Sequence, residues 1–124
     1  MTQERERLMA NITIYQKPTC STCRNVIKLV EKSGHPFTAI NYYETPFTKS
    51  KLKALLKKGS LQAKAVIRTK EDIYKSLGLA KKAKSEDELI DLMIKYPDLI
   101  QRPLVEKGDR VILARPPETI RTIL

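Results

Sequence analysis

The chain has few of the residues from which disulfide frameworks and metal centres are built. Its 124 residues include two cysteines and one histidine. Two cysteines cannot form a disulfide framework, so we interpret the pair as catalytic, redox-sensing or metal-binding. A structural zinc site needs four ligands, whereas the cysteines supply two and His35 lies in a Gly-His-Pro segment typical of a solvated turn. We therefore expect no metal site.

Aromatic residues and long apolar runs are also scarce. Aromatics make up 6% of the chain, and no apolar run approaches the length of a membrane-spanning helix. The net charge of +10 suits an anionic partner or substrate. However, binding single-stranded nucleic acid by base stacking would need aromatics near that charge. We therefore favour a solvated basic surface over direct nucleic-acid binding, and we expect no membrane association.

The length and composition indicate one domain of a cytoplasmic protein. With 124 residues and 41% hydrophobic content, the chain can build a core without covalent or metal staples. Residues 1–10 are mostly polar and lack the apolar segment of a signal peptide. We expect a flexible extension at residues 1–10 and a single domain over residues 11–124.

The order of the expected elements indicates an α/β fold. Residues 12–15 alternate apolar and polar side chains as a strand does, and residues 21–32 place apolar side chains on one helical face. Residues 37–43 form a second β-rich segment, so a parallel βαβ unit is expected. The remaining expected elements are helices at 49–58, at 70–77 and after the capping box 85–88, strands at 104–106 and 110–113 that form a hairpin, and a short helix at 116–124.

The C-x-x-C motif of Cys20 and Cys23 lies where the first expected strand gives way to the first helix. This arrangement is typical of thioredoxin-like redox proteins. At a helix start, unpaired N–H groups, the helix dipole and Arg24 one turn away would lower the pKa of the Cys20 thiol. Cys23 lies one turn deeper among apolar neighbours, within bridging reach of Cys20. We predict that Cys20 is the nucleophile, and Cys23 is a candidate resolving thiol.

The C-x-x-C motif lies among three short segments: Ile12-Thr-Ile-Tyr15, Pro18-Thr-Cys20 and Arg24-Asn25. Together they resemble the active-site segment of the glutaredoxin-coupled ArsC-type arsenate reductases. The resemblance continues in order through Ala65-Val-Ile-Arg68, Leu77-Gly-Leu79, Asp87-Glu-Leu-Ile-Asp91, Ile100-Gln-Arg102-Pro103 and Arg115-Pro116. It therefore covers nearly everything after Asn11.

The resemblance implies a thioredoxin-like mixed sheet with a helical insertion between its βαβ and ββα halves. It also implies that Cys20 is the nucleophile and that Pro103 is a cis-proline near it. Three arginines are implied to bind the oxyanion: Arg68, Arg102 and Arg115. Guanidinium groups suit a tetrahedral oxyanion because they offer directed, bidentate hydrogen bonds.

The implied reaction is the reduction of arsenate, or a similar oxyanion, to arsenite through a covalent adduct on Cys20. The thiolate displaces an oxygen as water, and glutathione and glutaredoxin then regenerate the enzyme. No bound cofactor is implied, since glutathione or another thiol reductant is a co-substrate.

Two positions depart from the pattern common in these reductases. Gln16 stands where a histidine is frequent, so activation of Cys20 should depend more on the helix start and the arginines. Cys23 stands where serine is common, and it would allow a Cys20–Cys23 disulfide reduced by thioredoxin or glutaredoxin. The second thiol is also similar to the redox switch of the Spx-type branch, which binds RNA polymerase. The alternatives are therefore an Spx-like regulator and a general glutaredoxin-like disulfide oxidoreductase.

Overall fold

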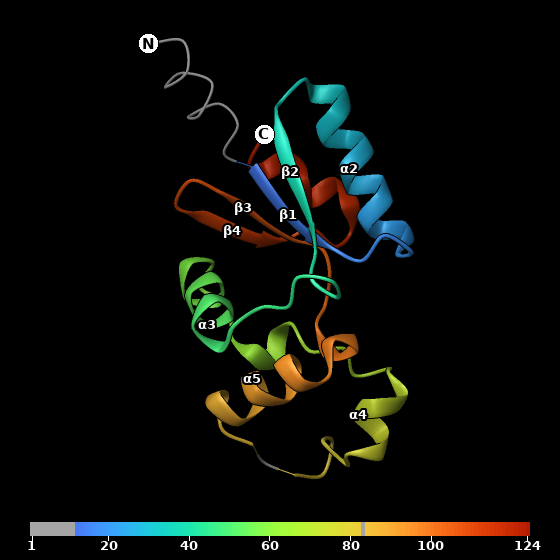
Figure 1. Cartoon of the computed structure of the whole chain (residues 1–124), viewed down its shortest axis with the longest axis vertical. Helices are drawn as coiled ribbons and strands as arrows, with labels where there is room; N and C mark the ends of the chain where they lie inside the picture. Colours follow the sequence, from blue (N-terminus) through green and yellow to red (C-terminus); the bar gives the residue numbers. More distant parts are fainter. Residues whose placement is uncertain (1–11, 83) are drawn as a thin grey trace. The chain divides into compact units, whose positions relative to one another are not determined.

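Residues 12–82 and 84–124 are described by a computed structural model of the chain (Figure 1). The predicted extension at residues 1–10 lies outside these described residues. The chain divides into two units, the first formed by the described residues up to Thr45 together with Arg102–Leu124, and the second by Pro46–Gln101. In the sequence, the second unit is thus an insertion between the two halves of the first.

The first unit contains a four-stranded mixed sheet with strand order β2-β1-β3-β4. Its strands are β1 (Ile12–Gln16), β2 (Phe37–Asn41), β3 (Leu104–Lys107) and β4 (Arg110–Leu113). β1 is parallel to β2, as the βαβ pattern predicts, and antiparallel to β3, while β3 and β4 form the predicted hairpin. This sheet confirms the predicted α/β, thioredoxin-like architecture.

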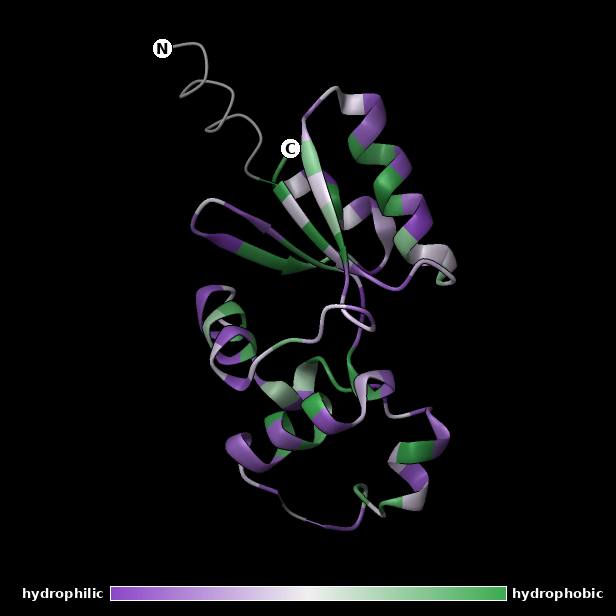
Figure 2. Cartoon of the chain, in the orientation of Figure 1, coloured by the Kyte–Doolittle hydropathy of each residue, from purple (hydrophilic) through white to green (hydrophobic). Residues whose placement is uncertain are grey.

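The helices α2 (Ser21–Ser33) and η3 (Pro117–Thr122) pack on one face of this sheet. Figure 2 shows hydrophobic bands alternating with hydrophilic ones along α2, and hydrophobic residues along β1. The core of this unit consists of Ile12, Ile14, Val26, Val30, Val105, Ala114, Ile120 and Ile123. Each fully buried aliphatic side chain contributes roughly 1.5–3 kcal/mol. This packing fixes the start of α2 beside the end of β1.

Two elements of the first unit differ from the sequence prediction. The second strand was expected at residues 37–43, but β2 ends at Asn41. The Asn41 side chain accepts a hydrogen bond from the Tyr43 N–H at 3.0 Å and its carbonyl accepts from Glu44 and Thr45, which closes a turn. The last helix is a 3₁₀ helix that ends at Thr122 rather than at Leu124.

The second unit is mainly helical, as the resemblance implies for an insertion. Its helices are α3 (Lys49–Lys58), η1 (Ala63–Ala65), α4 (Asp72–Ser76), α5 (Glu86–Lys95) and η2 (Pro97–Leu99). α3 has the predicted bounds, and α4 is shorter than the predicted 70–77. Within the described part of the chain, no helix is both long enough and apolar enough to cross a bilayer.

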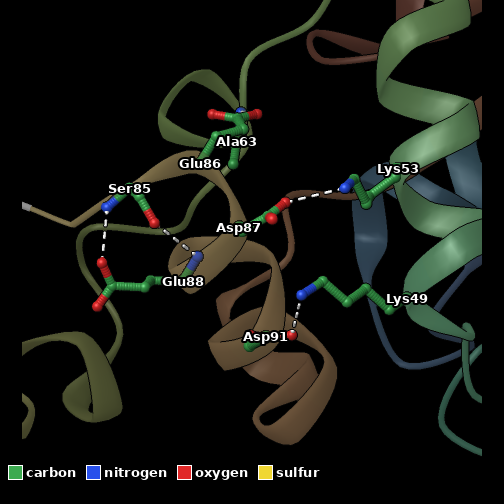
Figure 3. Close-up of polar contacts among 8 residues, drawn as sticks. All are labelled: Lys49, Lys53, Ala63, Ser85, Glu86, Asp87, Glu88 and Asp91. Atoms are coloured by element: carbon green, nitrogen blue, oxygen red, sulfur yellow. Dashed lines mark hydrogen bonds and ion pairs between the residues drawn. The ribbon is translucent and has the colours of Figure 1, made fainter.

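Ion pairs join α3 and α5 at the surface of the second unit (Figure 3). Lys49 Nζ lies 2.9 Å from Asp91 Oδ1, and Lys53 Nζ lies 3.0 Å from Asp87 Oδ1. The predicted capping box at the start of α5 is present, because Ser85 and Glu88 each accept the other's backbone N–H. The four paired side chains are 42–59% exposed, so the charge of these lysines is both paired and solvated.

Candidate active site

Cys20 is the N-cap residue of α2 and is half-buried. Its N–H donates to the Lys17 carbonyl at 2.9 Å, and its Sγ accepts from the Cys23 N–H at 3.5 Å. The first turn of a helix has unpaired N–H groups and the positive end of the dipole. The Cys20 sulfur therefore lies at a position that stabilises a thiolate.

Cys23 lies on the buried face of α2, with no exposed surface. Burial raises the pKa of Cys23 to about 12, and the neighbouring Cys20 sulfur also raises it. A hydrogen bond with the Lys17 backbone lowers this pKa but does not offset the other two effects. Both cysteines are free thiols. Among the described residues, no three His, Cys, Asp or Glu side chains cluster as metal ligands.

The pKa of Cys20 shifts in the opposite direction. Burial alone would raise it, but hydrogen bonds from the Cys23 backbone and thiol, together with hydrogen bonding and charge attraction from Arg102, lower the pKa of Cys20 below its ordinary value. The two thiols of the motif are therefore unequal: one favours the thiolate and the other keeps its proton.

Arg102 is a buried cation just before β3, with 6% of its surface exposed. Its Nη1 donates to the Tyr43 hydroxyl at 3.4 Å, and its Nε has no hydrogen-bond partner among the described residues. Burial opposes its charge, but Tyr42, Tyr43 and Cys20 raise the pKa of Arg102 above its ordinary value. A buried guanidinium whose charge is stabilised by phenol and thiol groups is suited to bind an anion.

Two further predicted site residues lie next to this group. The Arg102–Pro103 peptide bond is cis, as the resemblance implies, and so is the Arg115–Pro116 bond. Arg115 is exposed, and its Nη1 donates to the Arg102 carbonyl at 3.3 Å. The Arg115 side chain is therefore held beside the backbone of Arg102.

The two predicted supporting residues before and after Cys20 have different surroundings. Gln16 ends β1 and is buried, with its Oε1 lacking a hydrogen-bond partner among the described residues. Arg24 is exposed and its Nη1 donates to the Pro18 carbonyl at 3.2 Å. Arg24 thus stabilises the loop before Cys20 through a hydrogen bond. The charge that lowers the pKa of Cys20 is that of Arg102.

Arg68, the remaining predicted oxyanion ligand, lies in the second unit. Its Nε donates to Glu71 Oε1 at 2.8 Å, and its backbone N–H donates to the Leu99 carbonyl at 2.7 Å. Arg68 therefore has a carboxylate partner, whereas Arg102 forms no ion pair with a carboxylate among the described residues. Its convergence with the other two arginines stays a prediction.

Three residues near Arg102 and Cys20 were not predicted from the sequence: Tyr42, Tyr43 and Lys17. The tyrosine rings stack at 5.1 Å with an interplanar angle of 29°, and Lys17 Nζ lies 4.8 Å from the centroid of the Tyr43 ring. Both tyrosines directly follow β2, at the carboxyl end of a parallel strand, where ligand sites of open α/β sheets form. That position is the signal from which they could have been found.

Comparisons with a protein family, with known proteins and with solved structures all find similarity to this chain. The pattern of the ArsC family matches residues 15–123. The chain is 40% identical to an arsenate reductase of Escherichia coli strain K12, over 94% of this chain and 82% of that protein. It is 37% identical to the uncharacterized protein YfgD of the same strain, over 91% and 96%. The solved structure of an arsenate reductase from Vibrio cholerae has a TM-score of 0.86 and 36% identity, covering 91% of this chain and 97% of that one.

Proposed function

Because the chain belongs to the ArsC family, we propose that it reduces arsenate, or a similar oxyanion, to arsenite through a covalent adduct on Cys20. The observation that carries this proposal is the pairing of Cys20 at the start of α2 with the buried Arg102. A thiolate and a guanidinium that forms no ion pair within the described part of the chain provide a nucleophile and an oxyanion ligand in one place. The arsenate reductases among the relatives support the choice of oxyanion.

In the first step, the Cys20 thiolate attacks arsenic and one oxygen of arsenate leaves as water after protonation. The arsenic stays in the +5 state, so no electrons are transferred yet. Arg102 binds an oxygen of the oxyanion through its guanidinium and offsets the negative charge that meets the thiolate. Arg115, held beside the Arg102 backbone, and Arg68 are the proposed additional ligands.

In the glutathione route, a glutathione thiolate displaces a second oxygen as water and forms a sulfur–arsenic bond. A glutaredoxin thiolate then attacks the glutathione sulfur and forms a mixed disulfide. The electron pair of the broken sulfur–arsenic bond stays on arsenic, which is thereby reduced to +3. Hydrolysis of the remaining bond releases arsenite and the Cys20 thiol.

In the internal route, Cys23 attacks the Cys20 sulfur, and the electron pair of the Cys20–arsenic bond reduces arsenic to +3. Arsenite leaves, and thioredoxin or glutaredoxin reduces the resulting disulfide. The proximity of Cys20 is one cause of the raised pKa of Cys23. Once Cys20 is in the adduct its thiolate charge is lost, so Cys23 can release its proton more easily at that stage.

A general disulfide oxidoreductase is the second candidate function, because a reactive Cys20 beside a buried Cys23 suits dithiol exchange without any oxyanion. An Spx-like switch that binds RNA polymerase would use the same pair. Both alternatives, like the main proposal, place the protein in the cytoplasm, where reductants keep thiols reduced. The two alternatives differ from the main proposal because neither of them needs arsenate.

A coupled assay of NADPH consumption separates these functions. Wild type, Cys20→Ser and Cys23→Ser are assayed with and without arsenate, using either glutathione, glutaredoxin and glutathione reductase or thioredoxin and thioredoxin reductase. We expect arsenate-dependent consumption in wild type, none in Cys20→Ser, and a changed preference for reductant in Cys23→Ser. Consumption that is independent of arsenate would favour the oxidoreductase. No consumption with either donor, together with recovery of RNA polymerase from lysate by the purified chain, would favour the regulator.

A further inference from the structure

Tyr43 contacts two residues that in turn contact the cysteines. Its hydroxyl accepts a hydrogen bond from Arg102 Nη1 at 3.4 Å, and its ring lies 4.8 Å from Lys17 Nζ. Tyr42, which is 1% exposed, stacks on the same ring. The turn closed by Asn41 fixes the backbone at Tyr43. The position of the Tyr43 ring is therefore fixed by the buried Tyr42 ring and by the turn in its own backbone.

Lys17 and Arg102, which Tyr43 contacts, come from different parts of the chain. Lys17 precedes α2, and its carbonyl accepts the Cys20 N–H at 2.9 Å. Arg102 precedes β3, and its charge attracts the Cys20 thiolate. Tyr43 thus links the loop that carries the nucleophile to the arginine that stabilises it.

We infer that Tyr43 is a positioning residue that holds Arg102 and the Lys17 loop beside Cys20. The inference rests on the proposed role of Cys20 as the nucleophile. A lysine over a tyrosine ring is attracted by the negative face of the ring, and a hydrogen bond fixes the direction of a guanidinium. Removal of the Tyr43 hydroxyl should therefore let Arg102 move away from Cys20.

The hydrogen bond from Arg102 to Tyr43 is long, so its removal should have a modest effect. A typical neutral hydrogen bond changes an equilibrium by roughly threefold to tenfold, and a long one belongs at the lower end of that range. Tyr43→Phe should accordingly make Cys20 roughly threefold slower to alkylate below the midpoint of its pH profile. Tyr43→Leu, which also removes the ring next to Lys17, should slow it further.

The test measures the rate at which iodoacetamide alkylates Cys20 between pH 5 and 10, without arsenate. All proteins carry Cys23→Ser, so that Cys20 is the one thiol present. The matched control is Tyr15→Phe, which removes a hydroxyl hydrogen bond of the same 3.4 Å length to Glu106 Oε1. We expect the profile of Tyr43→Phe to move to higher pH and that of Tyr15→Phe to stay in place.

A double-mutant cycle identifies the route by which Tyr43 acts. If Tyr43 positions Arg102, Tyr43→Phe should have no further effect once Arg102→Ala is present. An unchanged profile in Tyr43→Phe, or an equal shift with and without Arg102, would overturn the inference. Because arsenate is absent, a shift in the thiol profile supports the role of Tyr43 even if the protein proves unable to reduce arsenate. Circular dichroism and the urea midpoint establish that each variant is folded.

Discussion

The two units of the chain use charged side chains in different ways. In the second unit, lysines of α3 and acids of α5 form exposed ion pairs, and Arg68 is paired with Glu71. In the first unit, Arg102 is buried and its charge faces a thiol and two tyrosines. Exposed pairs are screened by water and salt, whereas a buried charge is screened much less.

This difference indicates which part of the net charge of +10 can do chemistry. Most lysines of the second unit are exposed, so water and salt screen their charge and they contribute little to any single site. One buried arginine, placed next to a sulfur at a helix start, changes the protonation of that sulfur. For the chemistry of Cys20, the position and burial of a charge therefore matter more than the number of charges.

The largest expected effect is that of Cys20→Ser. Serine keeps the N-cap position but does not form an anion at neutral pH, so it cannot attack arsenate. Arsenate-dependent NADPH consumption should fall to the rate without enzyme, while the unfolding midpoint stays close to that of wild type. Turnover in Cys20→Ser would rule out the adduct on this residue.

Arg102→Ala should come next. Loss of the buried guanidinium removes an oxyanion ligand and should lower kcat/KM for arsenate about 100-fold. The pH profile of Cys20 alkylation should also move to higher pH, because Arg102 holds the pKa of Cys20 down. Arg110→Ala is the control, since Arg110 is exposed in the hairpin and donates to the Thr122 carbonyl. If both variants behave alike, Arg102 has no special role.

Arg68→Ala should have a smaller effect, roughly a tenfold loss in kcat/KM for arsenate. Arg68 must give up part of its pairing with Glu71 before it binds an oxyanion, so its net contribution is reduced. Glu71→Gln, which keeps the shape but removes the charge, should therefore lower the KM for arsenate. A larger loss for Arg68→Ala than for Arg102→Ala would reverse the proposed contrast between the units.

The raised pKa of Cys23 predicts an alkaline loss of stability. The unfolded chain releases this proton near the ordinary thiol value of 9.0, whereas the folded protein retains it up to about 12. Raising the pH through this window therefore favours unfolding, and the free energy of unfolding should fall. Urea denaturation of wild type and Cys23→Ser at pH 8 and 10.5 measures this. The decrease in the free energy of unfolding should be smaller in Cys23→Ser. An equal decrease would show that the pKa of Cys23 is not raised in the folded protein.

Lys53→Ala should have the smallest effect. Its ion pair with Asp87 is exposed, and exposed pairs are weakened by water and salt. We expect the urea midpoint in 1 M NaCl and the alkylation profile of Cys20 to match those of wild type. A shift of the Cys20 profile would mean that charge in the second unit acts on the thiol.

Local signals in the sequence predicted most elements. The apolar spacing and Gly59 gave the bounds of α3, and Ser85 with Glu88 marked the start of α5, because these signals act within one or two helical turns. Gly34 ends α2 with a φ of 78°, which glycine adopts without strain. The end of β2 was missed, because Asn41 could equally continue a strand or close a turn.

The chemistry of the site depends on contacts between distant parts of the chain, and these contacts were harder to predict from the sequence. The spacing of the cysteines indicated that Cys20 and Cys23 differ, since one precedes the helix and the other lies on its apolar face. The association of Arg102 with Cys20 was implied only by the resemblance. The two residues are distant in the sequence and come together because β1 pairs with β3, which residue spacing does not predict. The part played by Tyr43 depends on the Asn41 turn and was not foreseen.

The central claim is that Cys20 is a thiolate in an oxyanion site while Cys23 is a protected thiol. The most direct test is the rate at which each cysteine of the wild-type protein is alkylated by iodoacetamide at pH 7, followed by mass spectrometry with and without arsenate. We predict that Cys20 reacts well before Cys23 and that arsenate slows the reaction of Cys20. Equal rates for the two cysteines, or a Cys20 rate that arsenate leaves unchanged, would contradict the claim.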